Sequence, residues 1–230
     1  MEQIGVIIVA GGSGKRMGGS LPKQFSFVDG EPILVRTINT FARALPGAKI
    51  VVVLPADQLD YWRNLAARFR VARHATTTGG AERFHSVKNG IEALTGGVEL
   101  IAIQDGVRPL ATAEMIRRVA ECAAEHGAAI PVTPAVDSFR KVEGDTSHII
   151  DRTALRCVQT PQIFAADILR AAYDVEYDTS FTDDASVVEH AGFKIALCEG
   201  ERGNIKITTP EDIYIAEAIL AARRDLAEQD

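Results

Sequence analysis

The pattern of hydrophobic and polar positions divides most of the chain into alternating short apolar runs and amphipathic segments. Runs of β-branched and apolar residues predict five strands, over residues 4–10, 49–55, 99–105, 128–132 and 194–199. Helical spacing of apolar residues predicts helices over 32–44, 56–69, 82–94, 113–126 and 208–226. Nearly all-apolar strands that alternate with helices are typical of an α/β fold with a mostly parallel sheet covered by helices on both faces. Pro32 and Pro210 suit first helical positions, with Thr209 as a cap.

The alternation stops near Pro134. Between residues 135 and 159, two extended runs flank Glu143-Gly144-Asp145, a turn signal that predicts a β-hairpin. A lone hairpin is marginally stable in water, so it must pack on its own domain or on another subunit, and we favour the second. We therefore expect one domain over residues 1–230, with a β-arm inserted at about 135–159.

Composition places the chain among ordinary globular proteins. It has 230 residues, of which 47% are hydrophobic and 24% charged. The first residues carry no basic region, and the apolar run after them is too short to span a membrane, so we expect a cytoplasmic protein without a membrane partner. The three cysteines, Cys122, Cys157 and Cys198, are far apart and odd in number. We expect them to be reduced core thiols.

Charge singles out residues 10–25 (AGGSGKRMGGSLPKQF), which directly follow the first predicted strand. Five glycines and three cations lie in this segment, and no Asp or Glu occurs from Gln3 to Val28, although the net charge of the chain is −6. Glycine lets the backbone approach a ligand, successive N–H groups cradle an anion, and Lys and Arg add charge. A cationic loop on an acidic protein indicates a phosphate-bearing ligand rather than a nucleic-acid surface.

Known phosphate-loop motifs do not fit this segment. Arg16 follows Gly14-Lys15 where a P-loop needs Ser or Thr, and Met17 stands where a dinucleotide fingerprint needs its third glycine. A nucleophile elbow around Ser13 fails because Lys15 occupies the last glycine position. The remaining alternative is a flexible loop with solvated charges. Pro22 argues against it, because proline stiffens the approach to Lys23.

The combination A-G-G-x-G-x-R-M with L-P-K-Q-F resembles the sugar-phosphate cytidylyltransferases. The chain from Ile4 to about Leu220 is similar to the 2-C-methyl-D-erythritol 4-phosphate cytidylyltransferases of the non-mevalonate isoprenoid pathway. Further shared motifs are GGAERFHSV at 79–87, DGVRP at 105–109, DR at 151–152 with QTPQIF at 159–164, TDDAS at 182–186 and NIKITTPED at 204–212. The resemblance implies a Rossmann-like nucleotidyltransferase fold. It also implies a reaction in which a sugar-phosphate oxygen attacks the α-phosphorus of CTP and pyrophosphate leaves.

The resemblance implies roles for four cations. Arg16 and Lys23 would stabilise the transition state at the α-phosphate, while Lys206 and Arg152 would orient the attacking phosphate. Arg152 would reach across a homodimer from the β-arm, although it also fits an ordinary surface arginine. No general base is needed, because the attacking phosphate is already an anion. Such a reaction depends on positioning and on charge stabilisation.

The resemblance also implies a set of substrate contacts. They are Ala10, Gly11, Gly12, Gly14, Gly80, Ala81, Ser86, Asp105, Gly106, Arg108, Ser138, Thr160 and Thr182. Mg²⁺ is expected, held chiefly by CTP phosphates, so no protein metal ligand is assigned. Two of these residues have simpler readings, since Asp105 also fits a strand end and Thr182 a helix cap. His85 is interpreted as structural.

Three positions, Gly106, Val107 and Ser138, depart from the family pattern. The family often has D-A-A-R-P where this chain has Asp105-Gly106-Val107-Arg108-Pro109, and Ser138 stands where a threonine usually contacts the sugar. Two other functions remain open at this point. One is a ribitol-5-phosphate cytidylyltransferase, which shares the glycine loop, and the other is a non-catalytic nucleotide-binding module. Residues 181–186 and Asp137-Ser138 favour the methylerythritol phosphate, and the presence of both Arg16 and Lys23 favours an enzyme.

Overall fold

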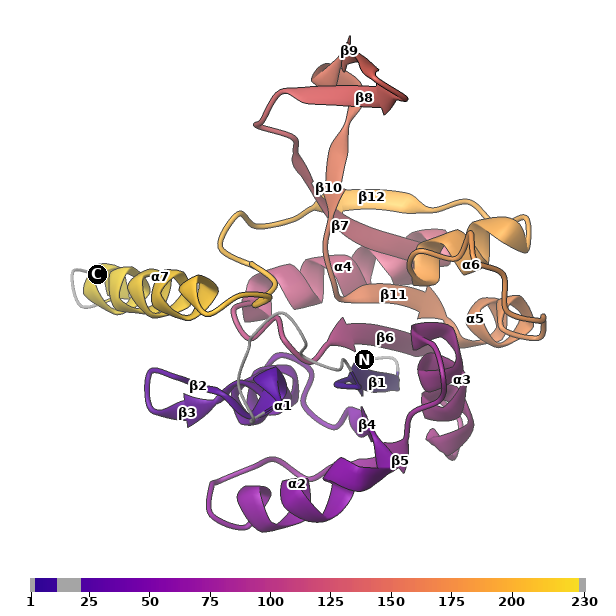
Figure 1. Ribbon diagram of the computed structural model, residues 1–230. Coiled ribbons are helices and arrows are strands. Elements are labelled where there is room, and N and C mark those ends of the chain that lie inside the picture. The colour runs from indigo at the N-terminus through magenta and orange to yellow at the C-terminus, as the bar shows by residue number, and fades with distance from the viewer. Residues whose placement is uncertain (1–2, 12–21, 228–230) are drawn as a thin grey trace.

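The computed structural model describes residues 3–11 and 22–227, and Figure 1 shows its architecture. The main sheet has eight strands in the order β10-β7-β11-β6-β1-β4-β5, with β12 paired to β7. These strands are β1 (Ile4–Val9), β4 (Lys49–Leu54), β5 (Ala75–Thr78), β6 (Leu100–Asp105), β7 (Ala128–Pro134), β10 (Arg156–Val158), β11 (Gln162–Ala165) and β12 (Ala196–Glu199). The pairs β1–β4, β1–β6, β4–β5 and β7–β12 are parallel, and β10 and β11 run the other way. The mostly parallel sheet predicted from the sequence is confirmed.

Helices cover both faces of the sheet, because the strand residues alternate between two apolar clusters. Val6, Ile8 and Val52 face α1 (Ile33–Ala44), α2 (Leu59–Ala66) and α4 (Ala113–His126). Ile7, Val51 and Ile103 face the helices of the opposite side, α3 (Arg83–Ala93), α5 (Ala166–Ala172) and α6 (Asp184–His190). Each fully buried side chain of this kind stabilises the fold by about 1.5–3 kcal/mol. The core therefore fixes the sheet edge on which the loops lie.

The C-terminal helix α7 (Glu211–Ala227) packs on a third cluster that includes Val28, Leu110 and Ala216. Val28 of this cluster belongs to β2 (Phe27–Val28), which pairs with β3 (Glu31–Pro32) and follows the short 3₁₀ helix η2 (Lys23–Phe25). No helix within residues 3–11 and 22–227 is long and apolar enough to cross a membrane.

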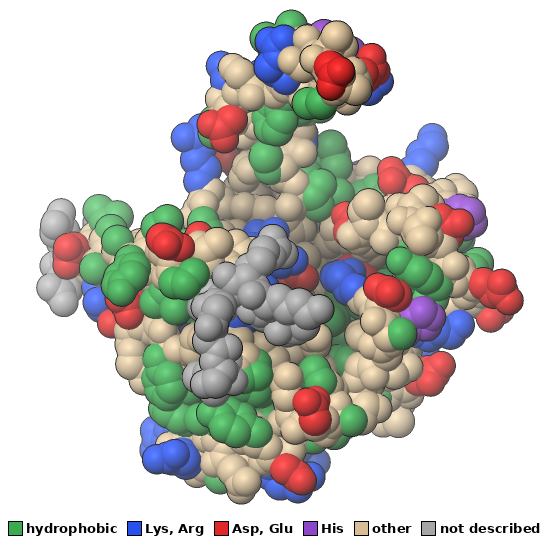
Figure 2. Space-filling model, viewed as in Figure 1, with side chains coloured by type: hydrophobic (Ala, Val, Ile, Leu, Met, Phe, Trp, Pro, Cys, Tyr) green, Lys and Arg blue, Asp and Glu red, His purple; other side chains and the backbone are tan. Residues whose placement is uncertain are grey.

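The predicted hairpin is β8 (Phe139–Glu143) paired with β9 (Thr146–Ile150), followed by the 3₁₀ helix η4 (Arg152–Ala154). Its strands form a separate two-stranded sheet that projects from the carboxyl end of β7 (Figures 1 and 2). Hydrogen bonds of Arg140 and Thr146 go to other hairpin residues, Ser147 and Glu143. The hairpin therefore folds on itself, and apolar Val142 and Ile149 are each 71% exposed.

Several sequence-based details are wrong. Pro32 precedes α1 as its cap rather than opening it. α7 begins at Glu211, because the Asp212 carboxylate accepts hydrogen bonds from the N–H groups of Thr208 and Thr209 and holds them outside the helix. Of the three free thiols only Cys198 is buried, and Cys157 is exposed on β10 near the base of the hairpin. Burial raises the pKa of Cys198 to about 12, with a contribution from neighbouring Cys122.

Candidate active site

Two cavities adjoin at the carboxyl edge of the sheet, where ligands of open α/β sheets bind. The first, of about 210 Å³, lies between the ends of β1 and β6 and the start of α3. Predicted residues that line it are Ala10, Gly11, Lys23, Gly80, Ala81, Ser86, Asp105 and Lys206. The second, of about 150 Å³, is lined by the predicted residues Asp105, Arg108, Thr160, Thr182 and Lys206. Residues from motifs far apart in the sequence therefore meet in one site.

The wall of the first cavity depends on glycines that precede α3. A Cβ on Gly80 would lie 2.3 Å from the Cβ of His85, so only glycine fits this close approach. The Ser86 hydroxyl accepts a hydrogen bond from the Gly80 N–H at 3.1 Å and donates to the Glu82 carbonyl at 3.2 Å. His85 and Glu82 form a capping box at the helix start. His85 thus has the structural role that we predicted, in the cap of α3, and these bonds hold the cavity wall in a fixed shape.

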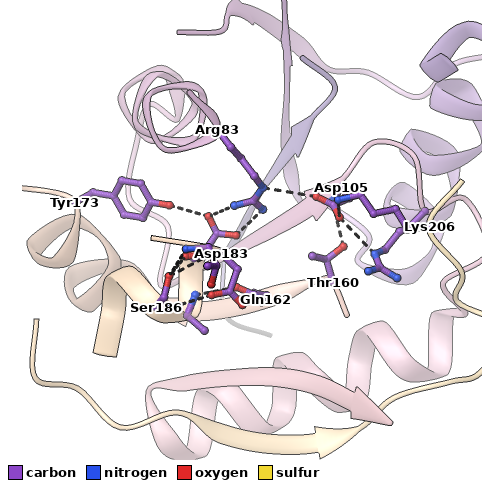
Figure 3. A network of polar contacts seen from close by, with 12 residues as sticks. Arg83, Asp105, Thr160, Gln162, Tyr173, Asp183, Ser186 and Lys206 are labelled. Carbon is purple, nitrogen blue, oxygen red and sulfur yellow. Dashed lines mark hydrogen bonds and ion pairs between the residues drawn. The ribbon is translucent and has the colours of Figure 1, made fainter. Parts of the chain in front are cut away.

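Asp105 lies at the centre of a group of cations at the end of β6 (Figure 3). Its Oδ2 is 2.9 Å from Lys206 Nζ and 3.4 Å from Arg108 Nε, and its Oδ1 is 3.7 Å from Arg83 Nε. Burial alone would raise the pKa of Asp105, but the charges of Arg83, Lys206 and Arg108 lower it to about 2. Asp105 is therefore an anion that orients three cations. The alternative interpretation, in which Asp105 only ends a strand, does not account for these contacts.

Arg83 was missed by the sequence reasoning. Its guanidinium makes two hydrogen bonds to the carboxylate of Asp184, at 2.8 and 2.6 Å, and Asp184 also accepts one from the Tyr173 hydroxyl at 2.7 Å. Burial lowers the pKa of Arg83, but the paired charge of Asp184 outweighs it and the net change is upward. Arg83 lines both cavities. The available signal was the position of Arg83 in GGAERFHSV and of Asp184 in TDDAS.

Thr160 and Thr182 lie in the second cavity. The Thr160 hydroxyl accepts a hydrogen bond from the Asp105 N–H at 3.1 Å. The cap of α6 is Asp183 and not Thr182, since the Asp183 carboxylate accepts from the Ser186 N–H at 2.9 Å. The simpler reading of Thr182 as a helix cap is therefore wrong, and its side chain is left beside the cavity.

Three predicted residues do not line either cavity. Gly106 packs behind the first one, where a Cβ would lie 2.9 Å from Ala10 Cβ and 3.1 Å from the Val9 carbonyl oxygen, and neighbouring Val107 lines the cavity instead. Ser138 and Arg152 are exposed at the base and end of the hairpin, away from the cavities of their own chain. Gly12, Gly14 and Arg16 lie outside the described residues.

The donor set fits a metal ion held mostly by its ligand's phosphates. Within the described part of the chain, no three His, Cys, Asp or Glu side chains group as metal ligands. Asp105 and Glu82 are the acidic residues of the first cavity. Asp105 pairs with cations and Glu82 caps α3, which leaves few oxygens for a protein cage. Mg²⁺ often binds through one or two carboxylates and substrate phosphates, and this site matches that pattern.

Two adjoining cavities and a group of cations at the carboxyl edge of a mostly parallel sheet are the arrangement expected of a nucleotidyltransferase. Comparison with known proteins specifies the family. Residues 4–222 match the family model described as IspD, 2-C-methyl-D-erythritol 4-phosphate cytidylyltransferase. The chain belongs to this family.

Individual relatives agree with the family assignment. The chain is 47% identical over 216 residues to the 2-C-methyl-D-erythritol 4-phosphate cytidylyltransferase of Bacteroides thetaiotaomicron, covering 94% of this chain and 98% of the relative. Identity to the Geobacillus kaustophilus enzyme of the same name is 42% over 221 residues, covering 94% and 96%. The crystal structure of the Thermus thermophilus enzyme matches with a TM-score of 0.76 at 33% identity, covering 95% and 98% of the two chains.

Proposed function

We propose that this chain transfers the cytidylyl group of CTP to 2-C-methyl-D-erythritol 4-phosphate, giving 4-diphosphocytidyl-2-C-methyl-D-erythritol and pyrophosphate. The observation that carries the proposal is that the two cavities share Arg83, Asp105 and Lys206. A nucleotide in the first cavity and a phosphorylated acceptor in the second would meet beside the same cations. The family match places this reaction in isoprenoid biosynthesis and does not favour ribitol 5-phosphate as acceptor.

The reaction needs no general base. An oxygen of the acceptor phosphate, already anionic near neutral pH, forms a bond to the α-phosphorus of CTP. The bond from the α-phosphorus to the oxygen that bridges to the β-phosphate breaks, and pyrophosphate leaves with that electron pair. Lys23, which lines the nucleotide cavity, stabilises charge on the α-phosphate, and Lys206 holds the acceptor phosphate. Arg16 shares the role of Lys23 by family resemblance.

Mg²⁺ belongs to the proposed reaction as a partner of CTP. When bound, it neutralises phosphate charge and favours departure of pyrophosphate. CTP phosphates would supply most of its ligands, because the oxygens of Asp105 are already paired with Lys206, Arg108 and Arg83. The protein's own contribution is the fixed array of Lys23, Lys206 and Arg108 around the reacting phosphates.

We further propose a homodimer formed through the hairpin, in a cytoplasmic enzyme. Exposed apolar Val142 and Ile149 on a hairpin that stands away from its own domain support a second copy as its partner (Figure 2). In that arrangement Arg152 and Ser138, which are remote from the cavities of their own chain, reach the acceptor cavity of the partner subunit.

The first experiment measures pyrophosphate release from CTP and Mg²⁺ with each of two acceptors. Release with 2-C-methyl-D-erythritol 4-phosphate and not with D-ribitol 5-phosphate is expected. A preference for ribitol phosphate would overturn the acceptor assignment while leaving the chemistry in place.

Lys23→Ala separates an enzyme from a nucleotide-binding module. Loss of one transition-state cation is expected to lower kcat by about 10²–10³ while CTP binding, measured by calorimetry, changes little. Lys194→Ala, the same change at an exposed lysine that lines neither cavity, serves as the control and should retain turnover. Equal activity of the wild type and Lys23→Ala would contradict the mechanism.

A further inference from the structure

Two buried amides lie beside the acceptor cavity and have no part in the chemistry described so far. Gln159 opens the QTPQIF motif and Asn204 opens NIKITTPED. Gln159 is 7% exposed and Asn204 is fully buried. A buried amide costs free energy unless its polar atoms are hydrogen-bonded, so the partners of these side chains indicate what they do.

Asn204 joins the three segments that surround Asp105. Its Nδ2 donates to the Thr160 carbonyl at 2.9 Å and is 3.4 Å from Gln159 Oε1. Its main-chain carbonyl accepts from Arg108 Nη1 at 2.9 Å. Lys206 follows two residues later, and the Ile207 N–H donates to the Val107 carbonyl at 2.9 Å. The side chain and backbone of Asn204 therefore fix Thr160, Arg108 and Lys206 relative to one another.

Gln159 fastens the same loop to the chain that returns from the hairpin. Its Nε2 donates to the Glu201 carbonyl at 2.7 Å, and its Oε1 accepts from the Glu201 N–H at 3.1 Å. A Cβ on Gly200 would lie 2.6 Å from Gln159 Oε1, so glycine permits this approach. The loop that carries Lys206 is thus held at Glu201 by Gln159 and at Ile207 by Val107.

We propose that Asn204 is a positioning residue for the acceptor phosphate. Its side-chain amide bonds the Thr160 carbonyl, and its main-chain carbonyl accepts from Arg108. Together these bonds hold Thr160, Arg108 and the loop that carries Lys206 at the spacing that aligns the attacking oxygen with the α-phosphorus of CTP. Thr160 and Arg108, the two groups bonded to Asn204, line the acceptor cavity and not the nucleotide cavity, so loss of the Asn204 side chain should affect the acceptor more than CTP. The proposal rests on the proposed function, since it assigns the second cavity to the acceptor. Misplacement of a reacting group by about 1 Å costs about 10²-fold in rate.

The test compares Asn204→Ala and Asn204→Ser with Asn39→Ala. Asn39 is a matched control, because its amide also joins two segments, donating to the Arg70 carbonyl at 2.8 Å and accepting from the Ala72 N–H at 2.9 Å, outside both cavities. Asn204→Ser adds no charge at this fully buried position, and its shorter side chain cannot reach the Thr160 carbonyl, so it tests that bond where Asn204→Ala fails to fold. Thermal unfolding and full kinetics are measured for each variant and for the wild type.

Both Asn204 variants are expected to raise KM for 2-C-methyl-D-erythritol 4-phosphate by about tenfold or more and to lower kcat, with KM for CTP within about twofold. Asn39→Ala should lower Tm and leave kcat, KM for the acceptor and KM for CTP nearly unchanged. Unchanged kinetics with a lower Tm would overturn the proposal in favour of a purely structural role, as would equal rises in both KM values. The wild type is assayed in parallel with both acceptors. If the wild type does not use 2-C-methyl-D-erythritol 4-phosphate, the proposed function fails. If the wild type uses it and the Asn204 variants do so equally well, only the role of Asn204 fails.

Discussion

At the scale of single residues, the site is organised around a carboxylate that does no bond-making. Asp105 holds Lys206, Arg108 and Arg83 together, and without it these cations would repel one another across the cavities. Their attraction outweighs the cost of burying the carboxylate, which is why the pKa of Asp105 falls to about 2. A phosphate that enters the site meets cations already fixed in place, so little reorganisation is needed when charge develops.

Asp105→Asn is expected to destabilise the protein in a pH-dependent way. The pKa of Asp105 in the folded state is about 2, below the ordinary value of 3.8 that applies to the unfolded chain. Asp105 therefore contributes stability above pH 3.8 that is lost as the pH falls toward 2, and the contribution at pH 7 is roughly 2 kcal/mol. Urea unfolding of the wild type and the variant from pH 7 to pH 3 measures the difference, which should narrow below about pH 4.

Asp60→Asn is the control for that experiment. Asp60 pairs with Arg63 at 2.7 Å, but both side chains are exposed, so the pair adds little stability. A wild-type advantage over Asp105→Asn that stayed constant down to about pH 3 would contradict the depressed pKa.

Gly106→Ala tests why this chain departs from the family pattern at that position. The added Cβ would lie 2.9 Å from Ala10 Cβ, so the end of β1, which leads into the glycine loop, must shift. We expect a loss of about 1–3 kcal/mol in the free energy of unfolding and weaker CTP binding. Gly97→Ala is the control, since a Cβ there meets nothing within 4 Å. Calorimetric CTP affinity equal to that of the wild type would show that the loop tolerates the methyl group.

At the scale of elements, the sequence predicts the strands and helices that are long enough to show a periodic pattern of apolar residues. The five predicted strands and the helix over 113–126 are confirmed, because long apolar or amphipathic runs dominate their local energetics. The polar edge strand β5 and the seven-residue helices α5 and α6 were missed. Two helical turns are too short to display a period, and an edge strand of alanine and threonines lacks the apolar signal of a buried one.

The site was predicted in part through its motifs. Lys23, Asp105, Lys206 and Thr160, which the resemblance assigned to the site, line the two adjoining cavities, because each stands in a recognisable motif. The pair of Arg83 with Asp184 joins residues 101 positions apart and is made by the packing of α3 against α6. The motifs single out these residues, but a single sequence does not show which motif residues pair in space, and the same holds for the amides Gln159 and Asn204.

Removal of the hairpin tests it as an independent element. Replacement of residues 139–150 by a short glycine-asparagine turn is expected to leave far-UV circular dichroism of the main domain intact, since Arg140 and Thr146 bond within the hairpin. If the hairpin forms the dimer, the trimmed protein should sediment as a monomer and lose turnover. A trimmed protein that remains dimeric would contradict the proposed interface. Wild-type protein at the same micromolar concentration is the control.

At the scale of the whole molecule, the proposed dimer would complete the acceptor site. The cavities contain Lys23, Lys206 and Arg108, whereas Arg152 lies in η4 and Ser138 directly precedes β8. In the proposed twofold dimer, each hairpin would lie on the other subunit, and Arg152 and Ser138 would be supplied to both sites. Such an arrangement makes activity dependent on assembly, so dilution below the dimer dissociation constant should reduce specific activity.

Mixing inactive variants tests whether the site is shared. Dimers of Lys23→Ala and of Arg152→Ala are each expected to be nearly inactive. After subunit exchange, the mixed dimer has one complete site, composed of Lys23 from one subunit and Arg152 from the other. Random exchange makes half of the dimers mixed, so pyrophosphate release should recover to about a quarter of the wild-type rate. Lys23→Ala mixed with Lys206→Ala is the matched control and should stay inactive, because Lys206 pairs with Asp105 of its own chain at 2.9 Å. If neither mixture recovers after exchange is verified by mass, Arg152 acts within its own chain or not at all.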